Sequence, residues 1–307
     1  MASAAGLARD RLDLLDPLEV STLGGLELVA EGVVEGFLSG LHRSPFRGFS
    51  VEFAEHRPYQ PGDELRYLDW KVVGRRDRLY VKQFVEETNL RATLVLDASR
   101  SMAWSGDPEH RLTKFDYATR LAAALALVLI RQRDATGLIA FDEEVRSAIA
   151  PRARPGQWHL LARALQDLAP GGGTAAEEAL GRVTALLRRR GLVIFISDLL
   201  VDRELVLLAL RYLRHRGHQV VVFHVMDPAE LDLTASGQAR FVDLETREGV
   251  VASPRDLRRD YRATVDRVIA AWRRELMSGG IAYQHVTTAT PFGHALRRAA
   301  ARRSRLG

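Results

Sequence analysis

Oxygen-bearing side chains gather in three loops of the sequence, in a pattern that suits a divalent metal ion. The first is the Asp-Ala-Ser-Arg-Ser loop at 97–101, which follows an apolar run and whose alternate residues point the same way in an extended segment. The second loop, rich in glycine, ends at Thr174, and the third holds the Ser-Asp pair at 197–198 after another apolar run. Carboxylate and hydroxyl oxygens are hard ligands, which favour Mg²⁺ or Mn²⁺. The predicted metal ligands are Asp97, Ser99, Ser101, Thr174 and Asp198.

The charge balance of this set predicts recognition of an acidic group rather than catalysis. A bound Mg²⁺ normally keeps water, or accepts an outside oxygen, at an open position. The carboxylates of Asp97 and Asp198 formally neutralise the ion, but hydroxyls add no charge, and a carboxylate that acts through water leaves the ion electrophilic. An Asp or Glu of another protein could complete the coordination through a short charge-assisted contact. We therefore expect a protein partner that offers an acidic residue, and no enzymatic activity.

The elements that must position these loops alternate between short apolar runs and helical patterns from about residue 93 onward, which is typical of βαβ units. The runs are continuously apolar, so we expect a mostly parallel sheet that is buried on both faces. Ligands bind beyond the carboxyl ends of the strands in such a sheet, and all three loops are expected at that edge. Strands are predicted at 93–97, 137–141, 192–196, 218–225 and 281–286, helices at 113–133, 158–168, 203–214, 254–277 and 292–303, another helix ending near 190, and a small hairpin between 241 and 251.

The residues before about 91 have a different pattern. A helix is predicted at 26–42, and strands are predicted at 49–53 and 79–84 around a loop that contains prolines. Helices and strands do not alternate there. We therefore predict an N-terminal α+β extension at 1–90 and one α/β domain at 91–307.

The order and spacing of the predicted ligands resemble the metal-ion-dependent adhesion site of the von Willebrand factor type A family, which has an Asp-x-Ser-x-Ser loop, a later Thr and a later Asp. The resemblance implies a von Willebrand factor type A fold, a Rossmann-like α/β domain. It also implies that the three hydroxyls bind the ion directly, and that the two carboxylates bind it directly or through water. A second interpretation stays open, with an Asx turn at Asp97, a helix N-cap at Thr174 and a strand-end Asp198.

Three upstream segments resemble bacterial domain-of-unknown-function family 58. They are Phe-Ala-Glu-His-Arg-Pro-Tyr-Gln-Pro-Gly-Asp at 53–63, Arg-Tyr-Leu-Asp-Trp-Lys at 66–71 and Leu-Tyr-Val-Lys at 79–82. With the metal loop, the resemblance spans about 43–198. It implies a partnership with a MoxR-type AAA+ ATPase in chaperone-like assembly or maturation of client proteins. The Asp69-Trp70-Lys71 stretch is either a packed aromatic flanked by an ion pair or a recognition surface.

Other sites and partners find less support. The chain has no cysteine, and its three lysines all lack the preceding glycine of a phosphate-binding Walker loop. The Gly171, Gly173 and Ala176 pattern of a dinucleotide loop follows a helical rather than a strand-like segment. A metal-dependent hydrolase acting on phosphate or acyl groups remains an alternative, although no general base is evident.

Charge and hydropathy indicate which partners and which cellular location to expect. The net charge of +5 comes mainly from scattered arginines, with a C-terminal cluster at 297–305, so a nucleic-acid-associated factor is a further but weaker alternative. The longest apolar run, 121–130, is too short to span a bilayer. Charged residues at 9–13 precede any long apolar stretch, which argues against a secretory signal. We expect a cytoplasmic protein.

Overall fold

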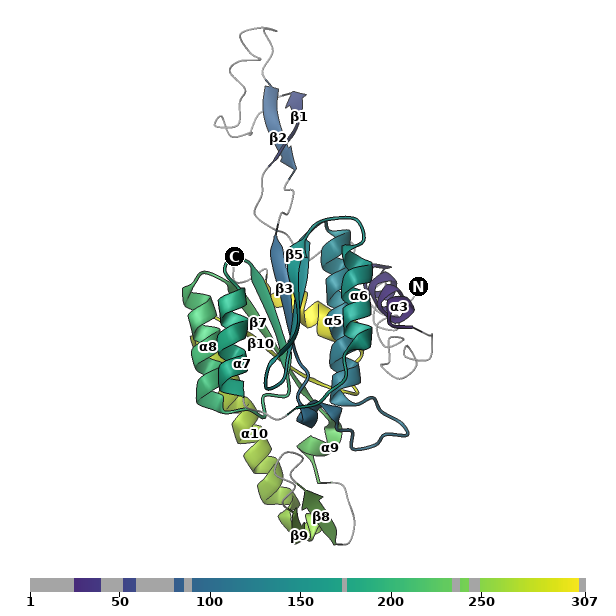
Figure 1. Cartoon of the computed structure of the whole chain (residues 1–307), viewed down its shortest axis with the longest axis vertical. Helices are drawn as coiled ribbons and strands as arrows, with labels where there is room; N and C mark the ends of the chain where they lie inside the picture. The colour runs from purple at the N-terminus through teal and green to yellow at the C-terminus, as the bar shows by residue number, and fades with distance from the viewer. Residues whose placement is uncertain are drawn as a thin grey trace, which may run out of the picture. The chain divides into compact units, whose positions relative to one another are not determined.

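The computed structural model describes residues 25–39, 52–58, 80–85, 90–172, 176–233, 238–242 and 249–303 (Figure 1). The chain divides into two compact units: Met1–Phe46 joins Arg91–Gly307 in the larger, and Arg47–Leu90 forms the smaller. One boundary of this division lies between Leu90 and Arg91. Helix α3 (Leu26–Ser39), expected in an N-terminal extension, belongs instead to the larger unit, where it packs on helix α5 (Lys114–Arg131).

A six-stranded sheet forms the centre of the larger unit, in the order β10-β7-β6-β3-β4-β5. All neighbouring strands pair in parallel except β4 and β5, which are antiparallel. The predicted α/β class, with a mostly parallel sheet flanked by helices, is confirmed. The strands are β3 (Arg91–Asp97), β4 (Ala135–Phe141), β5 (Val145–Arg152), β6 (Leu192–Ser197), β7 (Gln219–Met226) and β10 (Ala282–Thr287).

Burial explains why one of these strands was not predicted. β3 and β6 lie in the middle of the sheet and are buried almost throughout, as continuous apolar runs require. β5 is an edge strand whose residues alternate between half-buried and exposed, and it includes Pro151, which cannot donate to a neighbouring strand. Its weak apolar pattern and its proline hide the strand from sequence reasoning.

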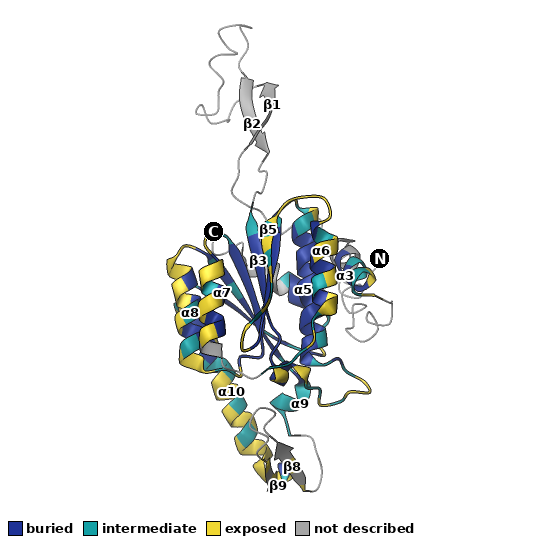
Figure 2. Cartoon of the chain, viewed as in Figure 1, coloured by how far each residue is buried: buried dark blue, intermediate teal, exposed yellow. Residues whose placement is uncertain are grey.

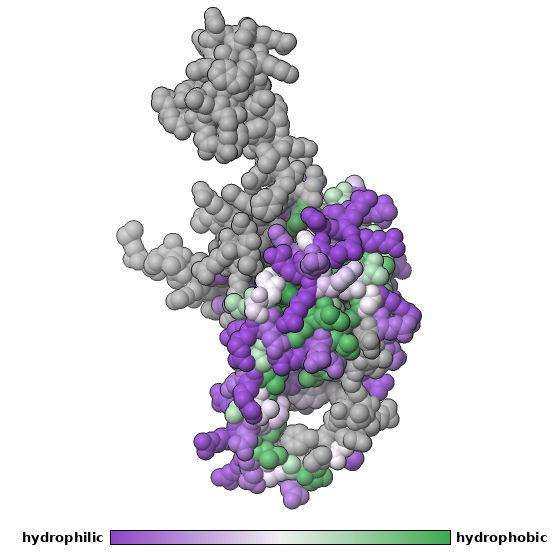
Figure 3. All heavy atoms as spheres, turned by 90° about the vertical axis from the view of Figure 1, so that its left-hand side faces the viewer, coloured by the Kyte–Doolittle hydropathy of each residue, from purple (hydrophilic) through white to green (hydrophobic). Residues whose placement is uncertain are grey.

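Helices cover both faces of the sheet (Figure 1). α5 packs on one face and contacts α3 and α6 (Gln157–Asp167), while α11 (Phe292–Arg303) contacts α3 and β10. On the other face, α7 (Ala176–Leu186), α8 (Arg203–His215) and α10 (Pro254–Ser278) contribute side chains to one apolar cluster with the strands. Figure 2 shows α5 almost wholly buried and α10 mostly exposed. In Figure 3, the side of the molecule that carries α8 is mostly hydrophilic with smaller apolar areas, as amphipathic helices produce.

Two strand pairs and one helical turn are further elements of the described chain. β1 (Glu52–Pro58) and β2 (Tyr80–Val85) pair antiparallel in the smaller unit. β2 agrees with the strand predicted at 79–84, whereas β1 overlaps the strand predicted at 49–53 only at residues 52–53 and extends into the predicted loop. β8 (Ala239–Val242) and β9 (Gly249–Ala252) form the predicted hairpin. α9 (Pro228–Leu231), a single helical turn, was not predicted. Within the described ranges, no helix has both the length and the apolar composition needed to cross a bilayer.

Candidate metal centre

Two of the three predicted loops leave the sheet side by side at its carboxyl edge. β3 ends at Asp97, and the adjacent parallel strand β6 ends at Ser197, directly before Asp198. After β3 the chain turns into a short 3₁₀ helix, Arg100–Ala103, which begins immediately after Ser99 and includes Ser101. The sheet therefore brings four of the five predicted ligands to one place, as the sequence predicted.

The first loop is a compact hydrogen-bonded turn. Oδ1 of Asp97 accepts a hydrogen bond from the backbone N–H of Ser99 at 2.9 Å, and the hydroxyl oxygens of Ser99 and Ser101 lie 3.1 Å apart. All three side chains are buried. The Asx turn considered as an alternative is thus present, and it is compatible with the metal interpretation because it leaves the two hydroxyls converging.

The third loop, at the end of β6, holds the Asp97 carboxylate by a hydrogen bond. The hydroxyl of Ser197 donates to Oδ2 of Asp97 at 2.6 Å and accepts from the backbone N–H of Leu199 at 2.9 Å. Oδ1 of Asp198 accepts from the backbone N–H of Leu200 at 3.2 Å. Ser197 was noticed in the sequence only as the neighbour of Asp198, and the structure makes it an orienting partner of Asp97.

The second loop approaches the first at its glycines. The backbone N–H of Gly171 donates to the carbonyl oxygen of Ala98 at 2.9 Å, which ties the two loops together. Gly172 has a φ of +66°, and a Cβ placed there would lie 2.8 Å from the carboxyl carbon of Asp142, so this position needs glycine. Thr174, the fifth predicted ligand, lies outside the described residues and remains a prediction.

A buried lysine is the main feature that sequence reasoning missed. Lys114, the first residue of α5, is only 1% exposed, and its ammonium donates to Oδ2 of Asp198 at 2.8 Å and to Oε1 of Glu230 at 2.6 Å. Burial alone would lower the pKa of Lys114, but the two carboxylates hold that pKa above its usual value. Its rarity was an available signal, since it is one of three lysines in an arginine-rich chain.

Glu230 is itself held rigidly. In α9, its Oε2 accepts from the backbone N–H of Asp227 at 2.8 Å, while Oδ1 of Asp227 accepts from the backbone N–H of Ala229 at 2.8 Å. These reciprocal bonds form a capping box. The hydroxyl of Thr288 donates to the other carboxylate oxygen of Asp227 at 3.0 Å. Lys114 therefore links Asp198, one of the predicted ligands, to the single helical turn α9.

The electrostatics of the site favour a cation beside Asp97. Burial and the neighbouring charge of Asp198 raise the pKa of Asp97 to about 6, against the opposing effect of its hydrogen bonds with Ser197 and Ser99. Those hydrogen-bond donors are uncharged, and Lys114 is engaged with Asp198 and Glu230. A cation beside Asp97 would offset both the burial and the repulsion.

The donor chemistry fits a hard divalent cation. Within the described ranges, no three His, Cys, Asp or Glu side chains gather into a metal cluster, so a centre here depends on hydroxyl oxygens as well as carboxylates. Asp97, Ser99 and Ser101 offer such oxygens from one turn, and Asp198 offers a carboxylate from the adjacent strand. Mg²⁺ and Mn²⁺ accept this kind of oxygen ligand.

The family model described as a protein of unknown function, DUF58, matches residues 55–270. The chain belongs to this family. Among its relatives are the uncharacterized proteins Mb1516 of Mycobacterium bovis and Rv1480 of Mycobacterium tuberculosis. Each is 30% identical to this DUF58 chain over 251 residues, a stretch that covers 78% of this chain and 75% of the relative.

Several solved structures are similar to this DUF58 protein. The conserved hypothetical protein BatB of Bacteroides thetaiotaomicron is 19% identical with a TM-score of 0.47, and the match covers 71% of this chain and 98% of BatB. An aerotolerance-related membrane protein of Bacteroides fragilis is 17% identical with a TM-score of 0.46, covering 69% and 99% of the two chains. The von Willebrand factor domain of the type V pili tip protein Mfa5 of Porphyromonas gingivalis is 14% identical with a TM-score of 0.30, covering 37% and 40%.

Proposed function

We propose that this DUF58 protein is a metal-ion-dependent protein-interaction module. Asp97, Ser99, Ser101 and Asp198 would hold Mg²⁺ or Mn²⁺, together with the predicted ligand Thr174. The ion would then accept a carboxylate from a protein partner. The observation that carries the proposal is the convergence of buried hydroxyl and carboxylate oxygens where β3 and β6 end.

The neighbouring groups support binding rather than catalysis. His224 hydrogen-bonds the backbone of Asp198, but burial and the nearby His285 lower the pKa of His224 to about 3. Its Nδ1 is also 2.7 Å from the hydroxyl of Tyr283. A general base works best when its pKa lies near the working pH, and His224 does not meet this condition.

We further propose that the partner is a MoxR-type AAA+ ATPase, or a client that such an ATPase delivers, and that the module acts in the cytoplasm. Family resemblance supports this partnership. The lysine pattern of the chain agrees with it, because a chain without a Walker loop would take its ATP-driven step from another polypeptide.

A binding experiment with the purified MoxR-type ATPase of the same organism tests the proposal. Wild type, Asp97→Ala and Asp167→Ala are each immobilised and exposed to the ATPase in Mg²⁺ or in chelator. Asp167 is a matched control because its side chain is 70% exposed at the end of α6. We expect capture by wild type and Asp167→Ala in Mg²⁺ only, and none by Asp97→Ala. Equal capture by all three proteins, with or without the metal, would overturn the metal-dependent mechanism.

A further inference from the structure

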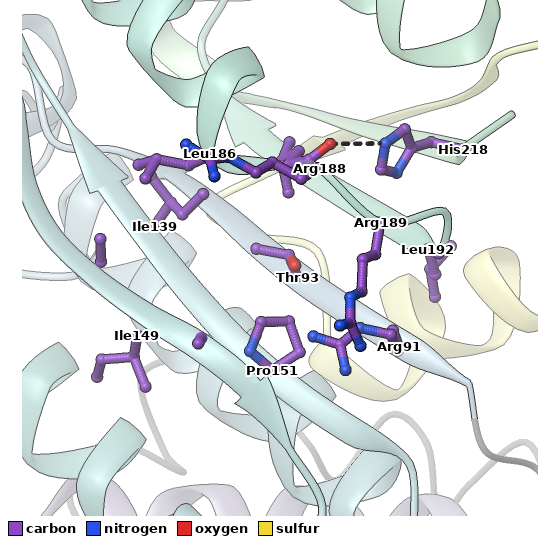
Figure 4. Close-up of a pocket in the computed structure, with 14 residues that line it drawn as sticks. Arg91, Thr93, Ile139, Ile149, Pro151, Leu186, Arg188, Arg189, Leu192 and His218 are labelled. Atoms are coloured by element: carbon purple, nitrogen blue, oxygen red, sulfur yellow. Dashed lines mark hydrogen bonds between the residues drawn. The ribbon is translucent and has the colours of Figure 1, made fainter. Parts of the chain in front are cut away.

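A cavity lies at the amino edge of the sheet, opposite the edge that carries the candidate metal centre (Figure 4). The cavity has a volume of about 280 Å³. The first residues of β3 and β6 form its floor, the last residues of β5 form one wall, and the connection from α7 to β6 forms another. Nothing in the proposed metal-dependent function uses this site.

The cavity exists because two elements stop covering the sheet there. α7 ends at Leu186, before the amino edge, and β5 breaks its register with β4 between Thr136 and Leu138. Gly137 accommodates this break, since a Cβ placed there would lie 2.5 Å from the carbonyl oxygen of Ile149. Nε2 of His218 lies 3.0 Å from the carbonyl oxygen of Leu187, which fixes the connection that forms the second wall.

The walls of the cavity combine an apolar floor with a basic mouth. Ile139 and Leu192 are buried in the floor, while Leu186 is 49% exposed at the rim. Arg91, Arg188 and Arg189 also line the cavity, and within the described part of the chain none of these three guanidinium groups forms an ion pair. In Figure 4, the Arg91 and Arg189 side chains both extend toward Pro151. Three arginines gathered at one cavity, with no ion pair to a carboxylate of the described residues, favour an anion.

We propose that this cavity binds a small organic anion with an apolar body. The anionic group, a carboxylate or a similar oxyanion, would be held by Arg91 and Arg189, because a guanidinium can donate two parallel hydrogen bonds to a carboxylate. The apolar body would cover Ile139 and Leu192. The volume of about 280 Å³ lies just below the usual range for ligand sites, roughly 300–1,000 Å³, so it suits a short aliphatic chain or a single ring rather than a folded peptide.

A matched pair of probes tests the proposal on the full chain. Calorimetric titration compares octanoate with octanamide, which has the same hydrocarbon body without the charge. We expect octanoate to bind saturably and about tenfold more tightly than octanamide, with an advantage that shrinks as salt is added. The double variant Arg91→Gln with Arg189→Gln should lose this advantage, while Arg211→Gln, an exposed arginine on α8, should keep it.

A variant that blocks the cavity distinguishes binding in the cavity from binding elsewhere on the surface. Ala148 lines the cavity and is exposed, so Ala148→Trp should fill the mouth without disturbing the core and abolish binding of both probes. Equal affinities for the two probes, or octanoate binding that survives in the arginine double variant, would overturn the anion site. Absence of saturable octanoate binding to the wild type would do the same.

Discussion

Replacing Lys114 by methionine would leave the buried carboxylate of Asp198 and the partly buried carboxylate of Glu230 without their shared cation. The ammonium lies 2.8 Å from Asp198 and 2.6 Å from Glu230, and the lysine is 1% exposed. Removing one partner of a buried ion pair costs about 3–5 kcal/mol, because an uncompensated charge stays in the interior. Methionine retains much of the apolar stem, so this loss reports mainly the charge. We expect the free energy of unfolding in chelator to fall by that amount.

The same variant should respond more strongly to Mg²⁺. With the ammonium gone, Asp198 is free to interact with the ion, and a repelling charge beside the site is removed. We therefore expect the affinity for Mg²⁺ to rise by about tenfold or more. An ion that binds only the folded chain raises the free energy of unfolding, and this gain grows with the logarithm of the ion concentration divided by Kd. Mg²⁺ should therefore recover part of the lost stability.

Urea unfolding followed by tryptophan fluorescence, in Mg²⁺ and in chelator, measures both effects. Arg120→Met is the control, since Arg120 lies on the same helix but is 21% exposed and pairs with Asp116 at 3.5 Å. It should cost no more than about 1 kcal/mol. A Lys114→Met protein as stable as the control, or one that gains no more from Mg²⁺ than wild type, would refute the reasoning. If this variant does not fold, Glu230→Gln leaves the Lys114–Asp198 pair in place and should show the same effects in weaker form.

Three further outcomes follow from the same contacts. His224→Gln should lose about 2 kcal/mol less stability than wild type between pH 7 and pH 5 in urea titrations, because the pKa of about 3 in the folded chain lies below the unfolded value, so acid favours unfolding of the wild type. Ser197→Ala removes the 2.6 Å hydrogen bond to the buried Asp97 carboxylate, and should lower the unfolding free energy by about 1–3 kcal/mol. Gly172→Ala forces a side chain onto a φ of +66°, 2.8 Å from a neighbouring carboxyl group, and should lower the melting temperature, whereas Gly171→Ala, with open space around it, should not.

The order of elements in the larger unit followed from local patterns. Continuous apolar runs located β3, β6 and the other parallel strands within a few residues, because burial on both faces leaves little room for polar side chains. The apolar pattern did not predict the edge strand β5, whose residues are only partly buried. It also did not predict α9, a single turn that depends on hydrogen bonds of its capping residues. The place of α3 beside α5 depends on long-range packing, which periodicity does not encode.

The candidate site was also predictable only in part. Asp97, Ser99, Ser101 and Asp198 could be grouped because strand ends in a parallel sheet share one edge. Lys114 could not be added to the group, since it starts a helix and reaches Asp198 only through the tertiary fold, 84 residues away in the chain. Its pairing with Asp198 modifies the predicted charge balance, because one of the two carboxylates already has a protein cation as its neighbour.

Titration of Mg²⁺ into the metal-free protein by calorimetry tests the central claim most directly. The account predicts saturable binding at a single site in wild type and in Asp167→Ala, and its loss in Asp97→Ala with the fold retained by circular dichroism. Wild-type protein that shows no saturable Mg²⁺ binding, or an Asp97→Ala protein that binds Mg²⁺ as tightly as wild type, would contradict it.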